Sequence, residues 1–343
     1  MHIFGITTYG IYKKSRSVLV QLQKIKMKKK FDVVSLFSGC GGFDLGFTGN
    51  FKFLKQNFSK TNFNIIWSND IDRSSCETYK KNLNGHIICQ DIKEILDNKY
   101  SKIFHNFPKK ADVILGGFPC QDFSLAGKRK GFKKSRGLLY TFMVRSVELL
   151  RPKVFVAENV KGLLSINNGY AIKKIVKDFS GLGYDVKYKL FKVSDYGVPS
   201  IRERVLIFGK RSNIKSNFEF PPPQKNNLTL YKVLYDLENK EEGYLENHYW
   251  SKAKFFKNTQ GNTYVKKDSF GPTIRAEHHG NIEWHWNKKR RLSAREVARI
   301  QTFPDNFIFY PSTSSAYKQI GNAVPPVFIW HFAKKLEKFL STI

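Results

Sequence analysis

The chain has 343 residues, and its 59 Lys and Arg against 28 Asp and Glu give a formal net charge of +31 at pH 7. This length can bury a complete α/β core and leave room for a second, smaller domain. The absence of any run of about 18 apolar residues excludes a membrane-spanning helix. The positive charge favours a polyanionic partner, although a lysine-rich bias across an A·T-rich genome would also raise it.

The first 30 residues carry eight Lys or Arg and no acid, and their apolar stretches are too short for a secretory signal. Met27 is followed by three lysines and then by strand-like sequence, which is typical of an alternative translation start. We therefore expect residues 1–30 to be a basic extension, either disordered or, for residues 1–26, upstream of the true start.

Five apolar runs predict buried strands that alternate with helices: 33–37, 65–68, 86–89, 113–115 and 154–157. This alternation predicts a doubly wound, mostly parallel α/β sheet, with residues 184–191 and 205–209 supplying a further pair of strands. In such sheets the ligand site lies beyond the carboxyl ends of the strands. The residues that follow the five strands are therefore expected to meet at one site: Gly39, Asp70, Asp91, Cys120 and Glu158.

The sequence pattern changes after residue 210, where the alternation of predicted strands and helices stops and polar and aromatic residues dominate. We expect a smaller, loop-rich domain over residues 211–290. After this region the sequence again predicts helices. One is capped by Ser293, with Glu296 at the capping-box position. A final helix is predicted over residues 327–340.

Cys120 lies in a loop after a buried strand and two glycines, with Pro119 directly before it. A cysteine in such a loop can act as a nucleophile, and an inert small hydrophobic residue is the alternative. Glu158 ends the fifth strand as a carboxylate, or as part of a helix cap. Arg202 and Arg204 place two guanidinium groups on one face of a strand, or at a solvated edge.

The turn at Gly39, Gly41 and Gly42 would let the backbone approach a ligand closely, or it is merely structural. A dinucleotide fingerprint needs the spacing G-x-G-x-x-G and an acid about 20 residues on, whereas Asp70 comes 31 residues after Gly39. With Asp91, the turn favours a nucleoside cofactor without a pyrophosphate. The cysteines Cys40, Cys76, Cys89 and Cys120 lack disulfide or zinc spacing, which favours a reduced cytoplasmic setting and no metal.

Five motifs in one order carry a family resemblance: Phe37-Ser38-Gly39-Cys40-Gly41-Gly42, Gly117-Phe118-Pro119-Cys120-Gln121, Glu158-Asn159-Val160, Arg202-Glu203-Arg204 and Gln319-Ile320-Gly321-Asn322-Ala323-Val324. This set resembles the cytosine-C5 DNA methyltransferases of bacterial restriction-modification systems. The resemblance covers roughly residues 31–210 and 290–330. It implies a Rossmann-like catalytic and cofactor-binding domain over 31–210, a target-recognition domain over 211–290, and the return of 291–343 to the catalytic domain.

The resemblance also implies the chemistry. Cys120 would add to C6 of a cytosine flipped out of double-stranded DNA, so that C5 accepts a methyl group from S-adenosylmethionine. Glu158 would share a proton with the base, and Asn159 would help hold it. Arg204 would contact the region of the cytosine O2, and Arg202 would support the loop or a phosphate.

By the same resemblance, the cofactor pocket is expected to contain Phe37, Gly39, Gly41, Asp70, Ile71, Asp91, Ile92, Pro119, Leu139 and Asn322. DNA contacts are expected from Ser124, Lys128 and Arg129 in a basic loop, and from Thr273 and Arg275. The family's usual glutamine before the two arginines is replaced here by Ser200, so loop closure is expected to differ.

Two alternatives stay open. A related RNA methyltransferase would carry a Cys-Phe-Thr signature in the later part of the chain, but no cysteine follows Cys120. A DNA-binding regulator with an inactive site would not need to retain Cys120, Glu158 and Arg204. The resemblance implies a monomer, and a companion restriction endonuclease is compatible with it.

Overall fold

The computed structural model describes residues 29–83, 85–97, 105–119, 139–225, 227–257, 261–276 and 281–343. The residues from Phe31 to Ile343 form one compact unit. The central sheet contains β1 (Phe31–Leu36), β4 (Phe63–Asp70), β5 (Ile87–Cys89), β6 (Val113–Gly116), β7 (Val154–Val160), β8 (Tyr184–Lys192) and β9 (Glu203–Arg211).

The strand order in this sheet is β5-β4-β1-β6-β7-β9-β8. The first five strands are mutually parallel, whereas β9 runs antiparallel to both β7 and β8. This arrangement confirms the predicted doubly wound, mostly parallel α/β sheet. Because β1, β4, β6 and β7 run parallel, their carboxyl ends lie along one edge of the sheet. The strand order reverses at β1, which has β4 on one side and β6 on the other, and the site is expected at this point.

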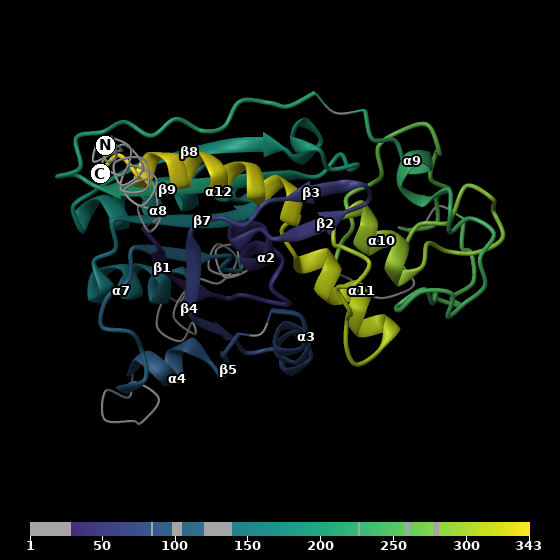
Figure 1. Ribbon diagram of the computed structural model, residues 1–343, viewed down its shortest axis with the longest axis horizontal. Coiled ribbons are helices and arrows are strands. Elements are labelled where there is room, and N and C mark those ends of the chain that lie inside the picture. Colours follow the sequence, from purple (N-terminus) through teal and green to yellow (C-terminus); the bar gives the residue numbers. More distant parts are fainter. Residues whose placement is uncertain are drawn as a thin grey trace, which may run out of the picture. The chain divides into compact units, whose positions relative to one another are not determined.

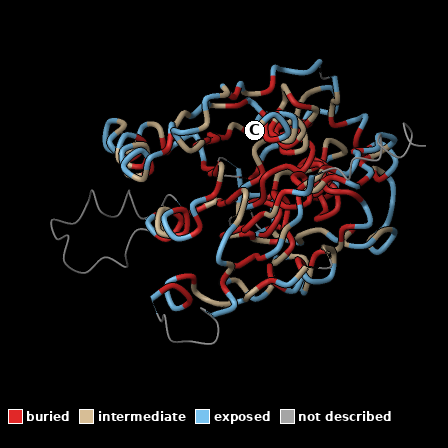
Figure 2. The backbone as a smooth tube through the Cα atoms, turned by 60° about the vertical axis from the view of Figure 1, so that its left-hand side comes forward, coloured by how far each residue is buried: buried red, intermediate tan, exposed pale blue. Residues whose placement is uncertain are grey.

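Both faces of the sheet are covered, because alternate residues of each strand point to opposite sides. Val34 and Ile114 face the core that includes α4 (Ile92–Asp97), α7 (Tyr140–Leu150) and α8 (Tyr170–Gly181). Val33 and Val113 face the opposite core, which α2 (Gly42–Thr48) and α12 (Pro326–Leu340) cover. In Figure 2 the buried backbone gathers in the interior, with exposed residues on the peripheral connections.

A third core joins α9 (Leu230–Leu234), α10 (Ala294–Ile300) and α11 (Thr313–Asn322) to the hairpin of β2 (Phe51–Phe53) and β3 (Gln56–Phe58). Figure 1 shows these elements together at one end of the sheet. Helix α10 begins at Ser293, whose side chain accepts a hydrogen bond from the Glu296 amide while Glu296 accepts one from the Ser293 amide. The predicted capping box is therefore confirmed.

The remaining elements are α3 (Arg73–Leu83), η1 (Lys161–Leu164) and η2 (Val193–Tyr196). None of the helices in the described ranges is both long enough and apolar enough to cross a membrane.

Candidate active site

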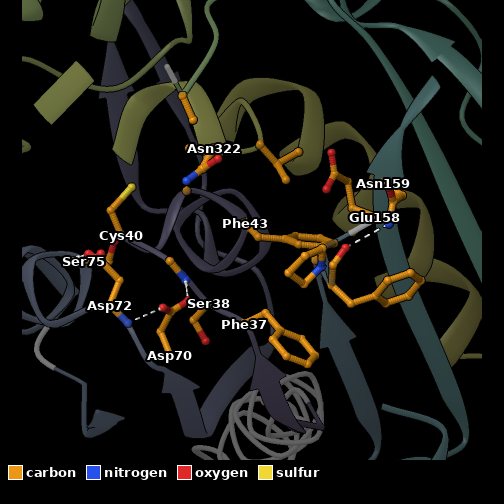
Figure 3. Close-up of a pocket in the computed structure, with 18 of the residues that line it drawn as sticks. Phe37, Ser38, Cys40, Phe43, Asp70, Asp72, Ser75, Glu158, Asn159 and Asn322 are labelled. Carbon is orange, nitrogen blue, oxygen red and sulfur yellow. Dashed lines mark hydrogen bonds between the residues drawn. The ribbon is translucent and has the colours of Figure 1, made fainter. Parts of the chain in front are cut away.

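A cavity of about 1800 Å³ opens at the carboxyl ends of the parallel strands. Figure 3 shows part of its lining, with the glycine turn after β1 on one side and the end of β7 on the other. The sequence-predicted residues that line it are Phe37, Gly39, Asp70, Ile71, Asp91, Ile92, Pro119, Leu139, Glu158, Asn159, Arg202, Arg204, Thr273, Arg275 and Asn322. Four further predicted residues, Cys120, Ser124, Lys128 and Arg129, lie outside the described residues.

The Asp70 carboxylate is fixed between the ends of two strands. Its Oδ2 accepts a hydrogen bond from the Gly39 amide at 2.7 Å, and its Oδ1 accepts one from the Asp72 amide at 2.9 Å (Figure 3). Burial raises the pKa of Asp70, against these two hydrogen bonds. The carboxylate is thereby held rigidly at the cavity wall with oxygen lone pairs left to accept hydroxyl donors.

Two apolar side chains flank this carboxylate. Ile71 is 65 % exposed although it lines the cavity, and Phe37 has a φ of 54°, in the left-handed region that non-glycine residues rarely adopt. An exposed apolar side chain beside a fixed carboxylate suits a ligand with an aromatic base and a sugar. S-adenosylmethionine has both, so this end of the cavity fits that cofactor.

The predicted glycines play different parts. Gly39 has a φ of 55° and open space around it, so the backbone there is accessible to a ligand. Gly41 does not line the cavity. A Cβ on Gly41 would lie 2.3 Å from Leu83 Cδ1 and 2.9 Å from Tyr79 Cδ2, so this glycine lets the start of α2 approach α3.

Glu158 and Arg204 form a buried ion pair at the other end of the cavity. Arg204 Nε lies 2.7 Å from Glu158 Oε1. Burial raises the pKa of Glu158, while the charges of Arg204 and Arg202 oppose the rise. A Cβ on Gly117 would lie 3.5 Å from Glu158 Oε2, so the carboxyl group adjoins the loop that precedes Cys120.

Asn159 holds that same loop. Its Nδ2 donates to the carbonyl oxygen of Phe118 at 2.9 Å, and its Oδ1 accepts from the Val160 amide at 2.9 Å. The side chain thereby fixes the backbone two residues before Cys120.

Arg202 contacts main-chain carbonyls from distant parts of the chain. It is 1 % exposed and donates to the carbonyl oxygens of Ile274 at 2.6 Å, Gly321 at 2.8 Å and Ala323 at 3.1 Å. Burial lowers its pKa, and the nearby Arg204 charge adds to the effect. Arg202 thus joins the start of β9 to residue 274 and to the end of α11.

Ser200 strengthens the same junction. Its Oγ donates to the Pro272 carbonyl at 2.9 Å and accepts from the Arg202 amide at 3.3 Å. The Ile201 amide donates to the Gly271 carbonyl, and the Gly271 amide donates to that of Pro199. The serine at this position therefore ties the β9 entry to the segment that continues into Thr273.

Sequence reasoning missed several polar and aromatic residues of the lining: Ser38, Phe43, Asn69, Asp72, Ser75 and Gln90. Asn69, Asp72 and Gln90 adjoin the predicted Asp70 and Asp91, so the end of each predicted strand was the available signal. Two histidines within residues 211–290, His248 and His285, are fully buried. His278 and His279 lie outside the described residues.

A family profile described as C-5 cytosine-specific DNA methylase matches residues 31–269 and 258–338. The chain belongs to this family. The predicted family, enzyme class and cofactor are thereby confirmed: the chain is a DNA (cytosine-5-)-methyltransferase, its substrate is DNA, and S-adenosylmethionine is the methyl donor.

Curated relatives are similar over most of their length. The methyltransferase is 35 % identical to the type II methyltransferase M.NgoFVII of Neisseria gonorrhoeae, over 89 % of this chain and 86 % of the relative. It is 36 % identical to M.BsuRI of Bacillus subtilis, over 86 % of this chain and 77 % of the relative. It is 35 % identical to M.FnuDI of Fusobacterium nucleatum, over 90 % of this chain and 95 % of the relative.

Solved structures share the fold of the methyltransferase. A DNA modification methyltransferase encoded in an E. coli prophage superposes with a TM-score of 0.70 at 24 % identity, covering 91 % of this chain and all of that one. Spodoptera frugiperda DNMT2 gives a TM-score of 0.63 at 18 % identity, with 90 % and 99 % covered. At these identities the likeness concerns the fold alone.

Proposed function

We propose that the methyltransferase modifies a cytosine that has been flipped out of double-stranded DNA, through a covalent bond between Cys120 Sγ and C6 of the base. The observation that carries this proposal is the convergence of Glu158, Asn159 and Arg204 with the loop that leads to Cys120, at the cavity that also contains Asp70 and Ile71. A base drawn from the stack would meet all of these groups at once, at a cost of a few kcal/mol.

Cys120 acts as the nucleophile. Its thiolate adds to C6, which makes C5 electron-rich, and its later departure by β-elimination accompanies loss of the C5 proton. The hydrogen bond from Asn159 to Phe118 supports this role, because it fixes the loop immediately before the nucleophile. Bound S-adenosylmethionine supplies the methyl group that C5 accepts.

Glu158 holds the proton that stabilises the base as the adduct forms. Burial raises its pKa, which favours the protonated carboxyl that a hydrogen bond to cytosine N3 requires. Arg204 orients this carboxyl through the 2.7 Å contact between its Nε and Glu158 Oε1. It would also contact the region of the cytosine O2. Arg202 supports the site from its three carbonyl contacts.

The cofactor end is formed by Asp70 and its neighbours. Asp70 accepts the ribose hydroxyls, while Phe37 and Ile71 cover the adenine. Asp91 and Ile92 would lie at the adenine edge, and Pro119, Leu139 and Asn322, which line the same cavity, would close the cofactor pocket. Gly39 would let the cofactor approach the backbone of the turn after β1. Gly41 lets this turn pack against the side chains of Tyr79 and Leu83.

Residues 211–290 are the target-recognition domain in this proposal, and 291–343 complete the catalytic domain. Phe256 and Tyr264 are 61 % and 41 % exposed, and Lys288 Nζ lies 5.7 Å from the Tyr264 ring centroid. Exposed aromatic and cationic groups suit a DNA surface. Thr273 and Arg275 would contact the DNA backbone beside the flipped nucleotide, and Ser124, Lys128 and Arg129 would supply further DNA contacts.

In the cell we propose that the enzyme acts as a monomer in the cytoplasm and protects host DNA within a restriction-modification system, beside an endonuclease that cuts the same short sequence. The type II methyltransferases to which the chain is similar support this setting.

Bisulfite sequencing of plasmid and host DNA from cells that express the full chain tests the proposal, with Cys120→Ser as the matched control. Wild-type protein should protect cytosines at one short motif, and Cys120→Ser should protect none while still binding S-adenosylmethionine. Soluble wild-type protein that binds the cofactor but protects no DNA cytosine would overturn the proposal. Methylation of structured RNA by the same preparation would then favour the RNA alternative.

A further inference from the structure

Two cysteines outside the proposed reaction lie on facing surfaces of α3 and β5. Cys76, in α3, is 2 % exposed and packs with Tyr79 and with Ile87 of β5. Cys89 is the last residue of β5 and is exposed. Ile87 and Cys89 are two positions apart in a strand, so both side chains lie on the face that Cys76 packs against.

Both sulfur atoms also contact consecutive carbonyl groups at the end of β4. Cys76 Sγ donates to the Asp70 carbonyl at 3.5 Å, and Cys89 Sγ donates to that of Ile71 at 4.0 Å. Asp70 and Cys89 are register partners in the parallel pair of β4 and β5. Burial raises the pKa of Cys76, and the neighbouring Cys89 thiol raises it further.

We propose that Cys76 and Cys89 form a peroxide-sensitive dithiol, and that its oxidation to a disulfide weakens S-adenosylmethionine binding. Hydrogen peroxide oxidises the exposed Cys89 thiol to a sulfenic acid and releases one water. The Cys76 sulfur then attacks the Cys89 sulfur, the S–O bond breaks, and the hydroxyl leaves as a second water with the Cys76 proton. Two thiols and one peroxide thus give one disulfide and two waters.

The disulfide acts on the cofactor end because its flanking residues line the cavity. Asp70 and Ile71 accept the two thiol contacts through their carbonyls, and Gln90, Asp91 and Ile92 directly follow Cys89. Oxidation removes both S–H donors, and closure of the S–S bond draws the end of β5 toward α3. The residues at the ends of β4 and β5, which line the proposed adenosine site, therefore move together.

The test uses the full chain with Cys120→Ser, so that peroxide cannot act on the proposed nucleophile and cofactor binding replaces methylation as the readout. The matched control is Cys120→Ser with Cys89→Ser, which alters an exposed residue. Cys40, whose pKa burial raises to about 12, is present in both proteins. After peroxide treatment, non-reduced peptides are analysed by mass spectrometry and S-adenosylmethionine affinity is measured by calorimetry.

A peptide pair joined through Cys76 and Cys89 is expected in Cys120→Ser, together with a loss of affinity of about tenfold that dithiothreitol reverses. The double variant should show neither change. Peroxide that converts Cys89 to its sulfinic acid without any joined peptide would overturn the dithiol. A joined peptide with unchanged affinity would overturn its link to the cofactor. Neither result depends on whether Cys120 is the catalytic nucleophile.

Discussion

Glu158 and Arg204 are diagonal neighbours on antiparallel strands. Glu158 pairs with Leu206 and Val160 with Arg204 in the register of β7 and β9, so the two side chains lie on one face, with Glu158 Oε1 2.7 Å from Arg204 Nε. They are 8 % and 7 % exposed. The antiparallel strand β9 therefore places the Arg204 guanidinium beside the Glu158 carboxyl, which lies near the end of β7.

Glu158→Gln tests whether this carboxyl carries the proton. The amide keeps the shape of the side chain but cannot share a proton with cytosine N3, so kcat should fall by about 10²- to 10⁴-fold. Methyl transfer to a DNA duplex that contains the target sequence gives the rate. Affinity for S-adenosylmethionine should stay within a factor of about two, because Asp70 and Ile71 are unchanged. A wild-type kcat would remove Glu158 from the proposed mechanism.

Arg202→Ala should cost about 3 kcal/mol in the free energy of unfolding, because three carbonyl groups at Ile274, Gly321 and Ala323 lose a buried donor. Arg202→Lys should recover only part of this, since an ammonium lacks the planar fork. Urea unfolding measures both. The exposed Arg73→Ala is the control, with an expected change within about 0.5 kcal/mol. Equal effects at Arg202 and Arg73 would show that the junction contributes no stability.

Gly321→Ala tests a close approach of two backbones. A Cβ on Gly321 would lie 2.3 Å from the carbonyl carbon of Arg275 and 2.4 Å from the Ala276 nitrogen. One of the two segments must move, which should cost about 2 kcal/mol of stability and displace Arg275 from the cavity, so that DNA binding weakens. Thermal unfolding and a DNA-binding titration report the two effects.

The control for Gly321→Ala is Gly181→Ala. Gly181 ends α8 and has nothing within 4 Å of an added Cβ. Alanine there should change stability by less than about 1 kcal/mol and leave DNA binding intact. If both variants behave alike, the contact at Gly321 is not the tight one that the structure describes.

The strands and the capping box were predictable because local patterns determine them. The apolar runs that end at Asp70 and Glu158 gave the correct sheet class and the edge at which the cavity opens. The ordered motifs then indicated which residues to expect there.

The hydrogen bonds that Arg202 makes to distant carbonyl groups could not be predicted from local sequence patterns. Its carbonyl partners are 72, 119 and 121 positions away in the chain, and any main-chain carbonyl can accept its hydrogen bonds, so no residue type marks the partner. The packing role of Gly41 was hidden for a similar reason. A glycine turn after a strand predicts backbone access, whereas the side chains of Tyr79 and Leu83 that fill the space come from another helix.

Asp44→Asn tests a pH-dependent contribution to stability. Asp44 is 1 % exposed and accepts hydrogen bonds from Ser35 Oγ and Tyr79 Oη, both at 2.6 Å. Burial raises its pKa from 3.8 to about 6, against the two hydrogen bonds. Because the folded-state pKa lies above the unfolded one, the folded state binds the proton more tightly. The stabilising contribution is complete below pH about 4 and is lost as the pH rises through about 6.

Asparagine does not titrate, so the wild type should gain about 1 kcal/mol relative to Asp44→Asn when the pH falls from about 7.5 to about 5.0. Urea unfolding of both proteins at the two pH values measures this difference. Buried histidines such as His248, whose pKa is lowered by burial, oppose the trend in absolute stability, since they favour unfolding as the pH falls. They are present in both proteins and cancel in the comparison. Parallel pH curves for the two proteins would mean that Asp44 keeps its ordinary pKa in the fold.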